Sequence, residues 1–271
     1  GVVLPDSYGP ASVTCTGYDF SLGNIVYDGD SVWATDDLSN NLVRVNTLIP
    51  RGDHASVADL PGQAEIVDLS AYDIGSRIQY SCYGGGRYWF AYASSGRCDI
   101  YSINVNDSSD IVLGISYSDV AGTVSPTRGS LLFDGEFLYA GYFVGYIGNV
   151  FAAEIRKFRI NSDYSLTQLA SNTYTFPYAI QDGCCMMCCD HEYIYATISQ
   201  SRVLRARLSD LAQDEIYVTW DGTYYVSYHH RPLYDGQYFW VLATDESQPS
   251  PNQMWVIKKL YRKPFDLKAT I

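Results

Sequence analysis

The sequence has few lysines and no long apolar run. Lysine supplies only 5 of the 18 basic residues, beside 4 histidines and 3 methionines. No stretch approaches the roughly 18 consecutive apolar residues of a membrane-spanning helix, so we expect no membrane span. The first residues show no basic segment followed by an apolar run, so no signal peptide is visible. No segment has the periodicity of an amphipathic helix, which argues against a helical fold.

Positive charge is also scarce. The net charge is −12, and residues 1–135 carry 16 acidic against 6 basic side chains. Because such a surface repels phosphate backbones, we expect no nucleic-acid partner. Tyrosine, by contrast, is abundant, with 25 residues, and 47% of the chain is hydrophobic. That apolar content suffices for one core, and we interpret residues 1–271 as a single domain.

An eight-residue pattern recurs five times along the chain. In each copy a turn follows an anchor residue, and the residue five positions after the anchor is Trp or Tyr. The anchors are Asp28, Gly84, Asp134, Asp190 and Asp235. We expect the aromatic residues to occupy equivalent, largely buried positions in successive repeats; they are Trp33, Trp89, Tyr139, Tyr195 and Trp240. The anchors are spaced by 56, 50, 56 and 45 residues, which is the range of one propeller blade.

Short strands surround every anchor. The expected innermost strands are residues 23–27, 77–83, 129–133, 184–189 and 228–234. Alternating return strands follow at residues 42–45, 100–103, 155–160, 203–208 and 255–260, with weaker fourth strands at 65–69, 111–117 and 215–220. Asp-Gly between apolar runs favours a tight hairpin turn. The sequence therefore predicts an all-β fold, a five-bladed β-propeller of four-stranded antiparallel blades.

The repeat also resembles a known family. Residues Asp28-Gly29 and Val32-Trp33-Ala34-Thr35, followed by Asn41-Leu42-Val43-Arg44-Val45, resemble the repeat of YVTN-type (YncE-like) β-propellers. Tyr195-Ala196-Thr197 with Val203-Leu204-Arg205 resembles it again. The resemblance covers about a third of each blade and implies the propeller fold, but no catalytic residue, because the matched positions are structural.

Catalytic patterns are missing. A glycosidase needs two carboxylates that flank the scissile bond, yet the five expected innermost strands hold no Asp or Glu. The repeated anchor aspartates indicate a turn-forming role, because an active site breaks the symmetry of a repeat. No nucleophile elbow, phosphate loop or paired-His zinc motif is present. We expect a protein without enzymatic activity or cofactor; the alternative is a five-bladed-propeller glycoside hydrolase or another glycan-acting enzyme.

Two kinds of segment raise the question of a metal. Cys185 and Cys188, near His191, lie three residues apart on an expected strand, so they point to opposite faces and we predict buried thiols and no metal. Two oxygen-rich segments suit calcium chemically but match no known ligand spacing, which favours solvated turns. They are Asp36-Asp37 with Asn40-Asn41, and Asn104, Asn106, Asp107 and Asp110.

Aromatic residues form the candidate binding surface. The loops at one face of the predicted propeller hold Tyr142, Phe143, Tyr146, Phe151, Tyr174, Tyr178, Tyr224 and Tyr225. The alternative for these aromatic residues is packing between blades. A loop from Tyr142 to Phe151 would be too apolar to remain in water, so it either folds back over the top of the central tunnel or meets a partner, and its glycines favour the partner. We therefore predict a non-catalytic binding or structural module of a surface assembly. It would be an extracellular adhesin or a virion or phage-tail component, whose partner is a protein neighbour, a receptor or a surface glycan.

Overall fold

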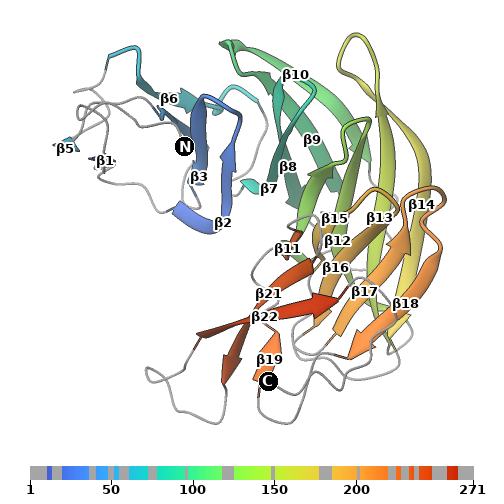
Figure 1. The fold of residues 1–271 in the computed structure, drawn as a ribbon. Coiled ribbons are helices and arrows are strands. Elements are labelled where there is room, and N and C mark those ends of the chain that lie inside the picture. The colour runs from blue at the N-terminus through green and yellow to red at the C-terminus, as the bar shows by residue number, and fades with distance from the viewer. Residues whose placement is uncertain are drawn as a thin grey trace.

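The computed structural model describes residues 11–13, 20–36, 41–47, 52–54, 61–72, 78–94, 97–117, 125–147, 150–176, 185–199, 202–218, 224–226, 232–234, 238–245 and 255–261. Within these ranges every regular element is a strand, as the sequence predicted (Figure 1). None of the described residues belongs to a helix long and apolar enough to cross a membrane.

The strands form five four-stranded sheets in chain order. The first sheet contains β2 (Phe20–Tyr27), β3 (Ser31–Asp36), β4 (Asn41–Asn46) and β6 (Ala64–Asp68). The second contains β7 (Ile78–Gly84), β8 (Arg87–Ser94), β9 (Arg97–Asn104) and β10 (Asp107–Tyr117). The third contains β11 (Ser125–Phe133), β12 (Phe137–Ile147), β13 (Val150–Ile160) and β14 (Leu166–Phe176). Each is an antiparallel meander.

The last two sheets complete the series. The fourth contains β15 (Met186–Cys189), β16 (Tyr193–Ser199), β17 (Arg202–Arg207) and β18 (Gln213–Val218). In the fifth, β19 (Tyr224–Val226) and β20 (Leu233–Tyr234) pair with β21 (Tyr238–Asp245), which also pairs with β22 (Trp255–Tyr261). A separate parallel pair of β1 (Ala11–Val13) and β5 (Gly52–His54) has no counterpart in the sequence prediction.

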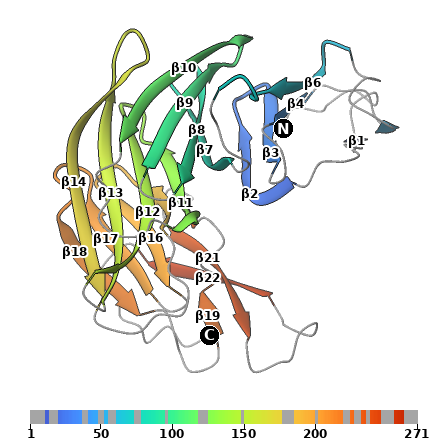
Figure 2. The same cartoon turned by 180° about the vertical axis from the view of Figure 1, so that it is seen from behind.

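Consecutive sheets lie side by side. The strand β2 contacts β7, β7 contacts β11, β11 contacts β15, and β15 contacts β20. The first strands of neighbouring sheets therefore meet on the inner side of a curved row, with β10, β14 and β18 on its outer side (Figures 1 and 2). This arrangement is propeller-like.

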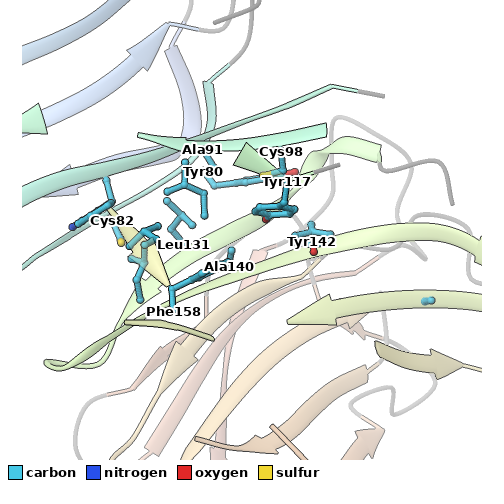
Figure 3. Packing of buried hydrophobic residues seen from close by; sticks show 14 residues of the cluster. Tyr80, Cys82, Ala91, Cys98, Tyr117, Leu131, Ala140, Tyr142 and Phe158 are labelled. Carbon is cyan, nitrogen blue, oxygen red and sulfur yellow. The ribbon is translucent and has the colours of Figure 1, made fainter. Parts of the chain in front are cut away.

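The core lies between the sheets. One buried cluster joins the first and second sheets, where the rings of Trp33 and Tyr88 stack 5.0 Å apart. A second cluster joins the second and third sheets through Trp89, Leu138 and neighbouring side chains. Figure 3 shows this cluster, with Cys82 of the second sheet and Leu131 of the third among its labelled residues. A third joins the third and fourth sheets. Each of the first three sheets thus buries apolar side chains against the next one in the chain.

Four of the five repeated aromatic residues occupy the buried positions expected of them. Trp33, Trp89, Tyr139 and Tyr195 are buried, which confirms the prediction for four copies, and Trp240 is half-buried.

The anchors explain why the pattern repeats. Asp28 accepts a hydrogen bond from Trp33 Nε1 at 2.6 Å. Tyr139 and Tyr195 donate their hydroxyls to their own anchor aspartates at 2.8 and 3.3 Å. In the second sheet, which has glycine instead, Trp89 Nε1 donates to the Gly84 carbonyl at 3.0 Å. In the first four sheets the anchor therefore ties the hairpin turn to the buried aromatic residue.

One expected loop is a hairpin. The structure continues β12 to Ile147 and begins β13 at Val150, with Tyr146 opposite Phe151, so the predicted loop from Tyr142 to Phe151 is wrong. A run of apolar residues without two-residue alternation gave no strand signal. The hairpin pairs backbone groups that a loop would leave to water.

Candidate functional site

A groove lies at one end of the third and fourth sheets. It has a volume of about 450 Å³ and is formed by the β11–β12, β15–β16 and β17–β18 turns together with β13. It is lined by Asp134, Glu136, Phe137, Tyr139, Lys157, His191, Glu192, Tyr193, Arg207, Leu208 and Ser209. We refer to it as the 3–4 groove.

Lys157 joins the two walls of the 3–4 groove. Its Nζ donates to the Leu208 carbonyl of the fourth sheet at 2.9 Å. The same atom lies 4.0 Å from the centre of the Phe137 ring and 5.7 Å from that of Tyr139, so aromatic faces stabilise the ammonium group. Lys157 is buried, and no carboxylate among the described residues makes an ion pair with it. An ammonium has three donors, so this wall offers a hydrogen-bond donor to a ligand.

The fourth sheet contributes the opposite wall through its anchor turn. Asp190 Oδ1 accepts hydrogen bonds from the backbone N–H groups of Glu192 and Tyr193 at 2.7 and 2.8 Å, which fixes the turn. His191 is exposed at the position where other anchors are followed by glycine, and at three of them, Gly29, Gly85 and Gly135, the φ angle is positive. The Arg205 guanidinium lies 4.7 Å from the centre of the Tyr193 ring.

The acidic residues of the 3–4 groove differ in their surroundings. Asp134 accepts backbone N–H groups from Glu136 and Phe137 on one oxygen and the Tyr139 hydroxyl on the other. Burial, and then the neighbouring Asp134 carboxylate, raise the pKa of the Tyr139 hydroxyl, so it stays a donor. Both carboxylate oxygens of Asp134 therefore accept hydrogen bonds from residues of their own hairpin. Glu136 and Glu192 are exposed and offer acceptor oxygens.

The aromatic residues predicted from the sequence lie elsewhere. Tyr142 is buried between the second and third sheets, and Tyr174 is buried between the third and fourth, where its hydroxyl donates to the Leu211 carbonyl. The prediction that Tyr142 and Tyr174 belong to an exposed binding surface is wrong, because both lie on sheet faces that a neighbouring sheet covers. Phe143, Tyr146 and Phe151 lie on β12 and β13, and Tyr224 and Tyr225 on β19; their side chains, and all of Tyr178, lie outside the described residues.

The cysteine run does not converge on one point. Cys185 and Met187 belong to the cluster between the third and fourth sheets, whereas Cys188 lies opposite Tyr195 on the other face of β15, as the spacing predicted. A Cβ at Gly141 would lie 2.6 Å from Cys185 Sγ, so only glycine allows β12 to approach this closely. In the part of the chain that the structure describes, no three His, Cys, Asp or Glu side chains are arranged to hold a metal.

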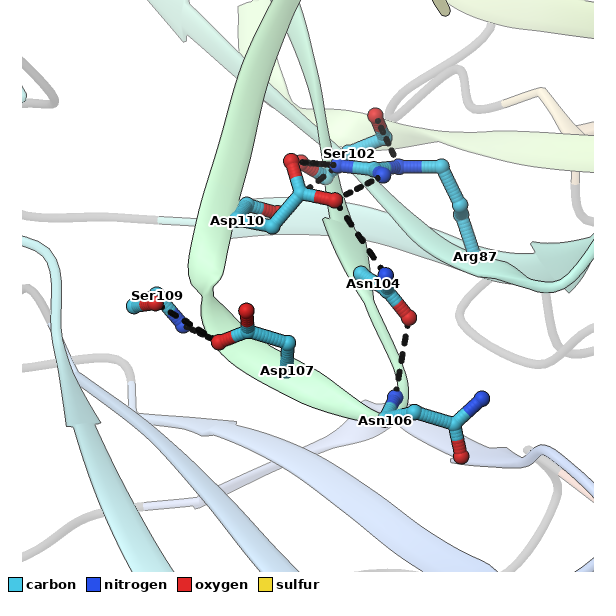
Figure 4. Close-up of polar contacts among 7 residues, drawn as sticks. All are labelled: Arg87, Ser102, Asn104, Asn106, Asp107, Ser109 and Asp110. Carbon is cyan, nitrogen blue, oxygen red and sulfur yellow. Dashed lines mark hydrogen bonds and ion pairs between the residues drawn. The ribbon is translucent and has the colours of Figure 1, made fainter.

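The second oxygen-rich segment is a hydrogen-bonded turn (Figure 4). Asp110 pairs with the buried Arg87 at 2.7 Å and also accepts Asn104 Nδ2 at 3.2 Å. Hydrogen bonds from Arg87 lower the pKa of the Asp110 carboxyl. Asp107 accepts the backbone N–H of Ser109 at 3.1 Å. These contacts favour the turn interpretation over calcium; residues 37–40 of the other segment lie outside the described residues.

Sequence reasoning missed the residues that give the 3–4 groove its chemistry, namely Phe137, Lys157, His191 and Tyr193. Two signals pointed to them. His191 replaces the glycine of the other anchors, and Lys157 is the one lysine before residue 258. Only His191 departs from the repeat, because Lys157 lies opposite the repeat aromatic, where three other sheets also have a basic residue, namely Arg44, Arg205 and Lys259.

Comparisons with known proteins give weak structural likenesses. No family model and no curated protein matches the sequence. The structure is similar to BamB from Moraxella catarrhalis, at 10% identity and a TM-score of 0.45, covering 82% of this chain and 60% of that one. The chain thus spans less than two thirds of the length of BamB. It is also similar to the computationally designed Ika4 protein, at 10% identity and a TM-score of 0.44, covering 72% of this chain and 98% of the other. At this level neither protein indicates a ligand for the 3–4 groove.

Proposed function

We propose that the chain is a five-bladed β-propeller that acts as a non-catalytic binding module and holds a glycan in the 3–4 groove. The observation that carries the proposal is the chemistry of that groove. The rings of Phe137 and Tyr193 stand beside donors from Lys157 and His191 and acceptors from Glu192 and Glu136. A sugar offers an apolar C–H face to a ring and hydroxyls that both donate and accept, so it matches this mixture.

The blade count rests on equivalent features in consecutive sheets. Each of the five sheets contains one copy of the repeat, and the first strands of neighbouring sheets contact each other in chain order. The interfaces between the first four sheets all use the aromatic residue five positions after the anchor.

The absence of catalysis is supported by the composition of the inner strands. The described strands β2, β7, β11, β15, β19 and β20 hold no Asp or Glu. A glycoside hydrolase, the alternative function, needs two positioned carboxylates. Since Asp134 is occupied by its turn, that alternative depends on Glu136 and Glu192, both of which are exposed.

We further propose that the module works on the surface of an assembly, as an extracellular adhesin or a virion component. The support is compositional: 25 tyrosines, few lysines and a net charge of −12 favour a soluble β-rich surface protein. A protein neighbour is the second class of partner for such a setting.

The test is a glycan-array screen of the purified protein, repeated with two matched variants. His191→Gly gives the fourth sheet the glycine that follows the other anchors, so it removes a groove side chain and keeps the Asp190 side chain that fixes the turn. Asp30→Asn changes the equivalent turn of the first sheet, far from the groove. We expect His191→Gly to lose at least about tenfold in affinity for the selected glycan and Asp30→Asn to bind like wild type. No glycan bound, or equal binding by all three proteins, would refute the proposal.

A further inference from the structure

The basic residue opposite the repeat aromatic has a carboxylate partner in two of the sheets. In the first sheet, Arg44 lies opposite Trp33 and pairs with Glu65 on β6 at 3.3 Å. In the fourth sheet, Arg205 pairs with Asp214 on β18. In both sheets the carboxylate comes from the next strand of the same sheet, so the positive charge is neutralised within the sheet.

The third sheet has no such carboxylate. The residue opposite Lys157 on β14 is Ala170, and no Asp or Glu occurs anywhere in β14. Lys157 is nevertheless buried, with 8% of its surface exposed. Among the described residues, its ammonium group has one hydrogen-bond acceptor, the Leu208 carbonyl of the fourth sheet. Lys157 is therefore a buried cation without a counter-ion, and such a charge is costly to bury unless an opposite charge meets it.

The other charged residues of the 3–4 groove do not supply the missing negative charge. Both oxygens of Asp134 accept hydrogen bonds within their own hairpin. Glu136 and Glu192 are exposed, and no ion pair among the described residues joins either of them to Lys157. The second cation of the groove, Arg207, already pairs with Asp210 at 2.7 Å. The unbalanced charge of the groove is therefore the Lys157 ammonium.

We propose that the glycan held in the 3–4 groove is acidic, and that its carboxylate or sulfate group pairs with Lys157. One ammonium donor is used by the Leu208 carbonyl, so two remain for the anionic group. Charge-assisted hydrogen bonds of this kind are roughly twice as strong as neutral ones. A neutral sugar would leave the buried charge unbalanced. The inference rests on the proposed function, because it names the chemical class of the glycan in that groove.

The acidity of the whole chain is compatible with an acidic ligand at this place. Most of the acidic excess lies in residues 1–135, with 16 acidic and 6 basic side chains. Residues 136–271 supply every groove residue except Asp134, and they hold 14 acidic and 12 basic side chains. Repulsion from exposed charges more than about 10 Å away is largely screened at physiological salt, whereas a direct contact with a buried ammonium is screened much less.

The first test needs only the wild-type protein. The glycan array presents each acidic glycan beside its neutral form: uronic-acid and sialylated glycans beside their carboxyl-reduced forms, and sulfated glycans beside their desulfated forms. We expect at least about tenfold tighter binding of an acidic form than of its neutral form, and the pair that responds distinguishes carboxylate from sulfate. Equal binding of both forms in every pair would overturn this inference and leave glycan binding intact. If no glycan binds, the proposed function fails as well.

The second test compares variants on the acidic glycan that responds and on its neutral form. Lys157→Met removes the charge, and Lys157→Gln removes it while keeping a donor. Arg159→Met is the matched control, because it loses the same charge at an exposed position of β13 outside the groove. We expect both Lys157 variants to bind the two forms about equally and Arg159→Met to keep the wild-type preference. Thermal unfolding identifies the variants that fold. A wild-type preference in either Lys157 variant, even at lower overall affinity, would overturn the pairing with Lys157.

Discussion

The indole N–H of Trp33 donates a hydrogen bond to the carboxylate of Asp28, five residues earlier, at 2.6 Å. The other oxygen of Asp28 accepts the backbone N–H groups of Asp30 and Ser31, so one side chain both shapes the turn and holds the buried ring. The same unit recurs at Asp134 and Asp190 with tyrosine in place of tryptophan. The repeat is therefore a hydrogen-bonded unit as well as a packing unit.

We expect Asp190→Ala to lower the free energy of unfolding by about 2–3 kcal/mol. The change removes the acceptor of two backbone N–H groups and of the buried Tyr195 hydroxyl, and unsatisfied buried donors are costly. Asp163→Ala is the control, because Asp163 shapes an exposed turn and should cost about 1 kcal/mol or less. Urea unfolding gives both values, and equal losses would contradict the role of the anchor.

We expect Trp89→Ala to cost about 3–5 kcal/mol, since the ring is fully buried between the second and third sheets and its loss leaves a cavity. Leu169→Ala, on the outer strand β14 with an exposed side chain, should cost about 1 kcal/mol or less. The measurement is again denaturant unfolding. A small loss for Trp89→Ala would mean that the sheets do not pack through this residue.

The Arg87–Asp110 pair predicts a dependence on pH. Arg87 lowers the pKa of Asp110 in the folded protein, so the pair stabilises the fold above the ordinary carboxyl pKa and loses this effect as the pH falls through the lowered value. We expect Asp110→Asn to be less stable than wild type near neutral pH. The difference should shrink between about pH 6 and pH 2. Unfolding curves across this range check it, and a constant difference would contradict it.

The thiols of Cys98, which is buried, and of Cys189, which is partly buried, should be unreactive in the native protein. Burial raises the pKa of Cys98 to about 12 and that of Cys189 to about 11. Both are therefore protonated at neutral pH, and the thiolate is the reactive form. We expect iodoacetamide to label their peptides slowly in native buffer and rapidly in urea, as read by mass spectrometry. Fast native labelling of either peptide would contradict this packing.

The fold followed from the sequence where local pattern and packing agree. Return strands predicted at residues 100–103 and 203–208 appear as Arg97–Asn104 and Arg202–Arg207. Gly29 adopts a positive φ of 111° in the turn that Asp-Gly predicted. Such residues carry their signal locally, in alternation or in a backbone requirement that glycine meets.

The 3–4 groove could not be predicted from the sequence, because its residues come together only when two sheets pack against each other. Lys157 and Leu208 are 51 positions apart and join through one hydrogen bond. Tyr142 looked like a surface residue because the sequence does not say that the neighbouring sheet covers it. The sequence signal for the groove was a departure from the repeat, such as His191 in place of glycine. The sequence analysis instead concentrated on the residues that match the repeat.

The central claim is that the 3–4 groove binds a glycan without cleaving it. The most direct test is calorimetric titration of the glycan selected on the array into the wild-type protein and the His191→Gly variant. The glycan is then recovered, and its mass is measured by mass spectrometry. The account predicts saturable binding by wild type, a loss of at least about tenfold for the variant, and a glycan of unchanged mass. Equal binding by the variant would contradict the 3–4 groove as the site, and a cleaved glycan would contradict a non-catalytic function.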